Sequence, residues 1–189
     1  MTVVDALSAA LGTALLGVEP GFGPPTLDVA PGSWVEALGA ARVAGAEFFD
    51  LLTAYDLGDE GFAVVAHVAT PDVSEHVLLR TRVDRDHPTL ATATGAYAGA
   101  AWHERETHEM FGIEFLGHAG LAPLLLSPGA PAAPLRKDTV LVARAARPWP
   151  GEKDPADSGG RGRRRRSLPP GVPDSWPDPA SRGESGVAP

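Results

Sequence analysis

The segment Trp102–Gly112 is the best candidate for a catalytic or metal-binding site in the sequence. Histidine and glutamate cluster there as they do in metal-dependent hydrolases. A zinc protease carries H-E-x-x-H on a helix, so that two histidines four residues apart share one face. His103 and His108 are five residues apart, which places them about 140° from each other around a helix. The Glu-x-x-His pair of di-iron centres does not occur either, since Glu104 is four residues and Glu106 two residues before His108. The spacing disfavours a metal site, and a free-standing metal hydrolase using His103, Glu104 and His108 is the least favoured function.

The sequence lacks the groups on which most other catalytic and redox sites depend. It contains no cysteine, which excludes disulfides, thiolate nucleophiles and cysteine-held zinc or iron–sulfur clusters within this sequence. No phosphate-binding loop, G-x-S-x-G elbow or dinucleotide-binding glycine pattern occurs in it. Any redox function of this protein would therefore use cofactors held by other chains.

The same segment presents charged side chains on nearly every side when it is drawn as a helix. These side chains are Glu104, Arg105, Glu106, His108 and Glu109. A helix without an apolar face is either solvated or lies between two surfaces, and the neighbouring Trp102, Met110 and Phe111 favour the second arrangement. We therefore expect an interface, with Arg105 holding a carboxylate of another subunit by two hydrogen bonds. The alternative is a surface helix stabilised by the pairs Glu104–His108 and Arg105–Glu109, each worth about 0.2–0.5 kcal/mol.

Three segments have the apolar period and the end signals of helices. The first runs through Leu15 to a stop at Gly17, the second occupies about 33–44 and the third about 96–110. The first two also carry the pattern of a capping box, in which a hydroxyl and a carboxylate three residues apart satisfy free N–H groups of the first turn. These pairs are Thr2 with Asp5 and Ser33 with Glu36.

Four segments have the composition of strands, the first of them short. They are Thr26–Val29, Phe48–Tyr55, Phe62–Ala69 and His76–Val83. In the last one Val77, Leu79, Thr81 and Val83 alternate with more polar residues, as in an antiparallel sheet that is covered on one face. We expect an α+β fold with a small, mostly antiparallel sheet and helices packed on one face. An irregular arm should follow over about 113–145, rich in Gly and Pro yet apolar enough to need a packing partner.

Charge divides the chain into two parts of different composition. Residues 1–143 hold 7 Lys and Arg against 18 Asp and Glu, for a net charge of −11, whereas 144–189 hold 9 against 6, for a net charge of +3. The second part is rich in Pro and Gly and too poor in apolar residues to offset the entropy of folding, so we predict a disordered tail over 146–189 after a domain over 1–145. The run Arg163–Arg166 could bind nucleic acid or an anionic membrane surface. The acidic body and the lack of accompanying aromatic residues favour a solvated tail and no nucleic-acid partner.

Two separated blocks carry a resemblance to a known family. Glu104–His118 reads E-R-E-T-H-E-M-F-G-I-E-F-L-G-H, and Pro134–Asp138 reads P-L-R-K-D. In this order they resemble the complex I 30 kDa subunit family, whose bacterial members are the C subunits of NADH-quinone oxidoreductase (NDH-1). Phe48–Asp56 and Phe62–His67 also look like strand motifs of that family. The sequence departs from the family pattern in the loop 119–133, where Ala119 replaces a proline and Ala122-Pro123 replaces paired arginines, and Glu109 replaces an aspartate.

The resemblance implies a cofactor-free structural subunit in the hydrophilic arm of a proton-translocating NADH:quinone oxidoreductase, not catalytic by itself. It would support electron transfer from NADH to quinone beside the quinone-site subunit and the iron–sulfur subunits, with the flavin and the iron–sulfur clusters in those partners. The alternative is the equivalent subunit of a related membrane-bound nickel–iron hydrogenase or F420-type dehydrogenase. The family motif residues expected at interfaces are Glu104, Arg105, Glu106, Met110, Phe111, Gly112, Gly117, His118, Pro134, Leu135, Arg136, Lys137 and Asp138.

The sequence also bears on the expected location of the protein. No stretch of about 18 consecutive apolar residues predicts a transmembrane helix. The apolar N-terminal stretch carries Asp5 and no basic residue before Arg42, which argues against a secretory signal. We expect a peripheral protein at the cytoplasmic face of the cell membrane, touching the membrane only through the complex.

Overall fold

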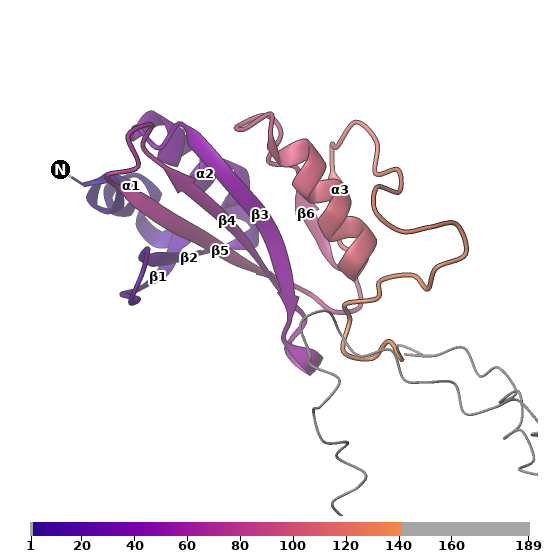
Figure 1. The fold of residues 1–189 in the computed structure, drawn as a ribbon. Coiled ribbons are helices and arrows are strands. Elements are labelled where there is room, and N and C mark those ends of the chain that lie inside the picture. Colours follow the sequence, from indigo (N-terminus) through magenta and orange to yellow (C-terminus); the bar gives the residue numbers. More distant parts are fainter. Residues whose placement is uncertain (1, 141–189) are drawn as a thin grey trace, which may run out of the picture. The chain divides into compact units, whose positions relative to one another are not determined.

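The computed structural model describes residues 2–140 and shows an α+β fold (Figure 1). The predicted tail over 146–189 and the last residues of the predicted arm lie outside the described residues. Three short 3₁₀ turns accompany the helices and strands. The main elements are α1 (Val3–Leu11), β1 (Leu15–Glu19), β2 (Thr26–Val29), α2 (Trp34–Val43), β3 (Phe48–Asp56), β4 (Phe62–Ala69), β5 (His76–Val83), β6 (Thr89–Ala91), α3 (Ala100–Phe111) and β7 (Glu114–Leu116).

Five strands form the main sheet in the order β1-β2-β5-β4-β3. Only β2 and β5 run parallel, and the other neighbours are antiparallel, which confirms the predicted mostly antiparallel sheet. The buried face of β5 carries Val77, Leu79, Thr81 and Val83, none of them more than 5% exposed. Buried side chains of α1, α2 and α3 join the same core, so the helices cover one face as expected.

The first helix is shorter than predicted, and the prediction that it includes Leu15 is wrong. The capping box of Thr2 and Asp5 is present and starts the helix. The helix ends at Leu11 because Gly12 adopts a positive φ of 49° and its N–H closes the last turn on the Ser8 carbonyl. Leu15 then begins β1 and pairs with Val29. Pairing with a distant strand outweighs the local helical period at this position.

The other two helices begin differently from the predictions. Ser33 makes no side-chain cap, because a 3₁₀ turn over Pro31–Ser33 leads into α2 and leaves Ser33 outside the extended conformation that a capping residue needs. The third helix starts at Ala100 and not near residue 96. A turn precedes it, and Tyr97 in that turn donates a hydrogen bond from its hydroxyl to the Ala46 carbonyl, 2.6 Å away.

A second, two-stranded sheet was not predicted. Its strands, β6 and β7, run parallel and flank α3 in the chain. Each has three residues, of which only the middle one is buried, Leu90 in β6 and Phe115 in β7. Strands this short carry too few alternating residues to produce a period-2 signal.

Candidate interaction surface

The irregular arm was predicted to begin near residue 113, but Ile113 is buried and Glu114–Leu116 form β7, so the described part of the arm is 117–140. Helix α3 lies between the main sheet and this arm (Figure 1). Its buried positions are Ala100, Glu104, Thr107 and Phe111, spaced to face the sheet along one side of the helix. Phe111 packs edge-on against Phe62 of β4, with 6.2 Å between ring centroids. The opposite side carries Arg105 and Glu109, which bind the arm. Helix α3 therefore lies between two surfaces of its own chain, and the predicted interface with another subunit stays a prediction.

Glu104 fixes α3 to the segment after β6. Its carboxylate is fully buried and accepts hydrogen bonds from the Thr92 hydroxyl and the Ala93 N–H, both at 2.5 Å. Burial raises the pKa of the Glu104 carboxyl, and these hydrogen bonds and the nearby His118 only partly oppose the rise. A fully buried side chain does not touch another subunit, so Glu104 serves an interface only by positioning its own helix.

The raised pKa of Glu104 gives a testable dependence of stability on pH. A carboxyl that binds its proton more tightly in the folded state contributes stability below its unfolded pKa of about 4.3, and this contribution is lost as the pH rises through the folded pKa. Glu104→Gln does not ionise. Its side-chain oxygen can still accept the Ala93 N–H, and its amide N–H can donate to the Thr92 hydroxyl oxygen, which in the wild type is the donor to the carboxylate. We expect the unfolding free energy of the wild type to fall relative to the variant as the pH rises above about 4.3. Urea unfolding of both proteins from pH 4 to pH 8 measures the difference, and a constant difference would contradict the assignment.

Arg105 and Glu109 hold the first part of the arm by its main chain. The Arg105 guanidinium donates to the carbonyls of Ala122 and Pro123 at 3.0 and 2.9 Å and lies 5.2 Å from the centre of the Trp102 ring. The Glu109 carboxylate accepts three consecutive N–H groups at 2.7 to 3.1 Å. These belong to Leu124, Leu125 and Leu126.

These contacts correct one expectation about the helix, that of local ion pairs. The pairs Glu104–His108 and Arg105–Glu109 are not among the ion pairs of residues 2–140, and the His108 ring instead bonds the Ile113 carbonyl at 2.9 Å. Within this chain Arg105 donates to two carbonyls, and a contact with a carboxylate of another subunit stays a prediction. Desolvation by itself would raise the pKa of Glu109, but the three N–H donors and the charge of Arg105 hold it below its usual range.

A second anchor holds the end of the arm and centres on Asp56, the last residue of β3. Asp56 is 7% exposed and accepts the Lys137 N–H at 2.8 Å, the Gly58 N–H at 2.7 Å and the Arg85 guanidinium at 3.0 Å. Burial would raise the pKa of Asp56, but these three donors outweigh it and the pKa lies below the ordinary value. Arg85 also pairs with Asp138 at 2.8 Å. The anchor therefore joins β3 to residues 81 positions later in the chain.

Two arginines complete this anchor around one aromatic ring. Arg136 lies 5.1 Å and Arg85 lies 5.6 Å from the centre of the Phe62 ring. Arg136 also bonds Asp138 at 3.2 Å. The sequence pointed to Arg136, Lys137 and Asp138 but missed Asp56 and Arg85. The strand motif that ends at Asp56 could have indicated this anchor, because a carboxylate at the end of a buried strand needs hydrogen-bond donors.

The remaining motif residues shape the path of the chain. Gly112 adopts the left-handed conformation, with φ 76°, that ends α3, and the half-buried Met110 accepts the Leu135 N–H at 3.1 Å with its carbonyl. Gly117 also has a positive φ, of 86°. The His118 ring bonds the Ala101 carbonyl at 3.1 Å and accepts the Gly120 N–H at 2.9 Å. Pro134 is half-buried, whereas Glu106, Leu135 and Lys137 are exposed.

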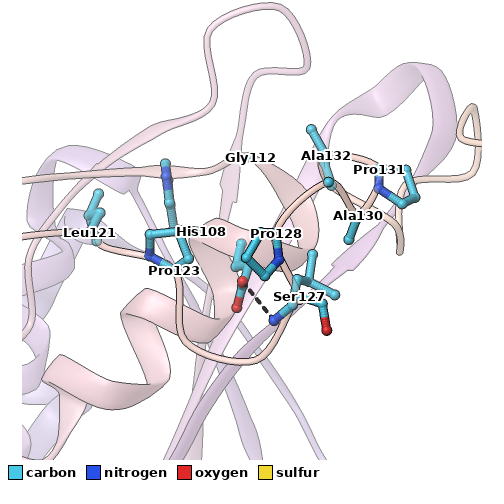
Figure 2. Close-up of a pocket in the computed structure, with 13 residues that line it drawn as sticks. His108, Gly112, Leu121, Pro123, Ser127, Pro128, Ala130, Pro131 and Ala132 are labelled. Atoms are coloured by element: carbon cyan, nitrogen blue, oxygen red, sulfur yellow. Dashed lines mark hydrogen bonds between the residues drawn. The ribbon is translucent and has the colours of Figure 1, made fainter.

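The arm leaves apolar surface uncovered. Five large apolar side chains on α3, β7 and the arm are 53% to 83% exposed; they are Trp102, Leu116, Leu125, Leu135 and Val140. A groove of about 560 Å³ runs between the end of α3, at His108 and Gly112, and the Pro-rich part of the arm (Figure 2). Polar contacts hold the arm on the body of the protein. Leu121, Leu124 and Leu126 are half-buried by it, whereas Leu125 and Leu135 stay exposed. An apolar groove beside exposed leucines is a candidate for a protein–protein contact.

The structure gives no support to the metal hydrolase hypothesis. His103 packs edge-on against Phe49, Glu104 is held by Thr92 and Ala93, and His108 bonds the Ile113 carbonyl, so the three do not converge. Over residues 2–140, no group of three or more His, Asp or Glu side chains is arranged to hold a metal ion. In the same range no helix combines the length and the apolar character that crossing a membrane requires.

Similarity to known proteins agrees with this architecture. The family described as respiratory-chain NADH dehydrogenase, 30 Kd subunit, matches residues 27–145. The C subunit of NADH-quinone oxidoreductase from Roseiflexus sp. (strain RS-1) is 36% identical over 147 residues, which cover 75% of this chain and 84% of that protein. The C/D subunit of the same enzyme from Phocaeicola vulgatus is 36% identical over 93 residues, or 49% of this chain and 18% of that protein.

Solved structures show the same fold. Nqo5, solved as a trypsin-resistant fragment, has a TM-score of 0.56 at 25% identity, covering 64% of this chain and 99% of that chain. A chain of the membrane-bound sulfane sulfur reductase, an archaeal respiratory membrane complex, has a TM-score of 0.67 at 20% identity, covering 80% and 95%. The second likeness shows the fold alone. With a family match over most of the described residues and a relative covered over most of its length, this chain belongs to the 30-kDa subunit family of respiratory-chain NADH dehydrogenase.

Proposed function

We propose that this chain is a cofactor-free structural subunit in the hydrophilic arm of a proton-translocating NADH:quinone oxidoreductase. It supports electron transfer from NADH to quinone by holding partner subunits in place, while the flavin and the iron–sulfur clusters belong to those partners. The observation that carries the proposal is the apolar surface of α3, β7 and the arm, which the chain's own contacts leave exposed. The complete absence of cysteine is consistent with a role that holds no cluster.

The partners that we propose are the quinone-site subunit and the iron–sulfur subunits, in a hetero-oligomeric complex. One relative is named as a C/D subunit, and the part that matches this chain is only 18% of that protein. The joint name supports a close association of this chain with a D-type subunit. We place the complex at the cytoplasmic face of the cell membrane, with this chain peripheral and without its own membrane contact.

A related complex is the second candidate. The fold likeness to a chain of the sulfane sulfur reductase supports a subunit of this shape serving other membrane-bound respiratory complexes, such as a nickel–iron hydrogenase or an F420-type dehydrogenase. Affinity purification of the tagged chain from its native membranes in mild detergent decides between them. Recovery of a flavin-bearing, NADH-oxidising subunit supports the first candidate, and recovery of a cysteine-bearing hydrogenase subunit supports the second.

The same purification tests the interaction surface. Leu125 is 58% exposed on the arm, so Leu125→Asp should leave the isolated chain folded. If this surface lies at the centre of an interface, the buried charge should lower the recovery of partner subunits about tenfold or more. Val43→Asp is the matched control, because Val43 is 91% exposed at the end of α2, away from the arm. Equal recovery with both variants would contradict a role for the arm in assembly.

A further inference from the structure

Two histidines face each other on the side of the main sheet that the helices leave uncovered. His67 lies in β4 and His76 in β5, and their neighbours Ala66, Val68 and Val77 point into the core on the other side. Their ring centroids are 5.4 Å apart. Nε2 of His67 is 3.3 Å from Nδ1 of His76, and the two rings share a hydrogen bond there when one of these nitrogens carries the proton. Two imidazole nitrogens therefore lie close together on the face of the sheet that the helices do not cover.

A carboxylate orients the first of these rings. Asp50 lies at an irregularity in the pairing of β3 with β4, between Phe49 and Leu51, and its Oδ2 is 2.8 Å from Nδ1 of His67. A β-bulge re-aims a side chain, and bulges are frequent beside functional sites. The contact places the ring proton of His67 on Nδ1 and leaves a lone pair on Nε2, directed at His76. A carboxylate behind a histidine is the usual outer partner of a metal-binding imidazole.

The distance between the two nitrogens fits a shared metal ion. Metal–nitrogen bonds of about 2.0–2.1 Å at a tetrahedral angle place two ligand nitrogens roughly 3.3–3.4 Å apart. The two rings have this separation without any movement of the strands. We propose that His67 and His76 form a binding site for a divalent transition-metal ion of the zinc, nickel or copper class, with Asp50 positioning His67.

The chemistry of the site sets its properties. Binding needs two neutral imidazoles, so His76 carries its single ring proton on Nε2 when Nδ1 coordinates the ion, and the proton moves there through solvent. With two protein ligands the ion completes its coordination with water and exchanges readily. Imidazole favours zinc, copper and nickel, whereas magnesium and calcium require oxygen ligands. A bound ion would join β4 to β5 and raise the unfolding temperature of the chain by mass action.

Zinc titration of the full chain tests the proposal, followed by calorimetry for stoichiometry and by thermal unfolding for stability. We expect one Zn²⁺ per chain, and a higher unfolding temperature with Zn²⁺ or Ni²⁺ but not with Mg²⁺. His67→Gln and His76→Gln keep polar side chains of similar size, and each should weaken binding at least about tenfold. Asp50→Asn should weaken it by about tenfold while both ligands remain. His87→Gln is the matched control, because His87 is exposed and lies outside the two strands.

Several results would overturn the site. Binding that survives His76→Gln, or that falls equally with His87→Gln, would show capture by scattered surface histidines. Absence of binding below about 1 mM Zn²⁺ in the folded wild type would exclude the site outright. Circular dichroism of each variant separates loss of a ligand from loss of the fold. The test needs no partner subunit, so its outcome does not depend on the proposed role in a respiratory complex.

Discussion

Asp56→Ala is expected to release the end of the arm and to lower the unfolding free energy by at least about 2 kcal/mol. The substitution leaves the N–H groups of Gly58 and Lys137 and the Arg85 guanidinium without their shared acceptor. Each buried donor without a partner costs about 1–3 kcal/mol. Asp59→Ala is the control, because Asp59 is an exposed aspartate in the turn that follows.

The expected consequence of Asp56→Ala extends to assembly. Residues 134–138 should become accessible to proteases and to hydrogen exchange, and recovery of partner subunits should fall if the arm forms the interface. Because the folded pKa of Asp56 is lowered, its stabilisation is present above its unfolded pKa of about 3.9 and is lost as the pH falls through the folded pKa. Wild type and variant should therefore converge in stability in strong acid. A difference that persists unchanged at low pH would argue against the ionic part of this anchor.

Gly61→Ala is expected to have the largest effect on the fold. Gly61 has φ 93° and ψ −139°, a region that essentially only glycine occupies, and an added Cβ would overlap the Val83 carbonyl oxygen. Backbone strain of about 1–3 kcal/mol adds to overpacking of about 1–3 kcal/mol. The obstacle is main chain of β5 and of the turn before Arg85, so it cannot rotate away as a side chain can. Together the strain and the overpacking should lower the unfolding free energy by about 3 kcal/mol or more.

Gly58→Ala provides the matched control for Gly61→Ala. Gly58 also has a positive φ, of 71°, but an added Cβ there meets no atom within 4 Å. The cost should be only the left-handed strain, about 1–2 kcal/mol. Thermal unfolding should show a fall of about 6 °C or more for Gly61→Ala and a clearly smaller one for Gly58→Ala, at about 2–4 °C per kcal/mol for a chain of this length. Equal falls would mean that the overlap with Val83 relaxes without cost.

Features that depend on neighbouring residues could be predicted from the amino-acid sequence. The strands β4 and β5 were predicted with their observed bounds, because alternation and turn residues lie within one short window. The capping box of Thr2 and Asp5 needs only residues three apart. The two motif blocks were sufficient to indicate the family, which the match over residues 27–145 confirms.

The meeting of distant groups depends on the folded chain and could not be predicted in this way. Leu15 became a strand residue because Val29 lies opposite it, and Asp56 acquired a role because Lys137 and Arg85 reach it from elsewhere in the chain. The sequence shows that Arg105 is charged but not which group it binds, and in the folded chain it donates to two carbonyls of the arm. Hydrogen bonds and packing depend on distances of a few ångströms in space and not on how far apart two residues are in the sequence. A partner 81 residues away therefore leaves no local period from which it could be predicted.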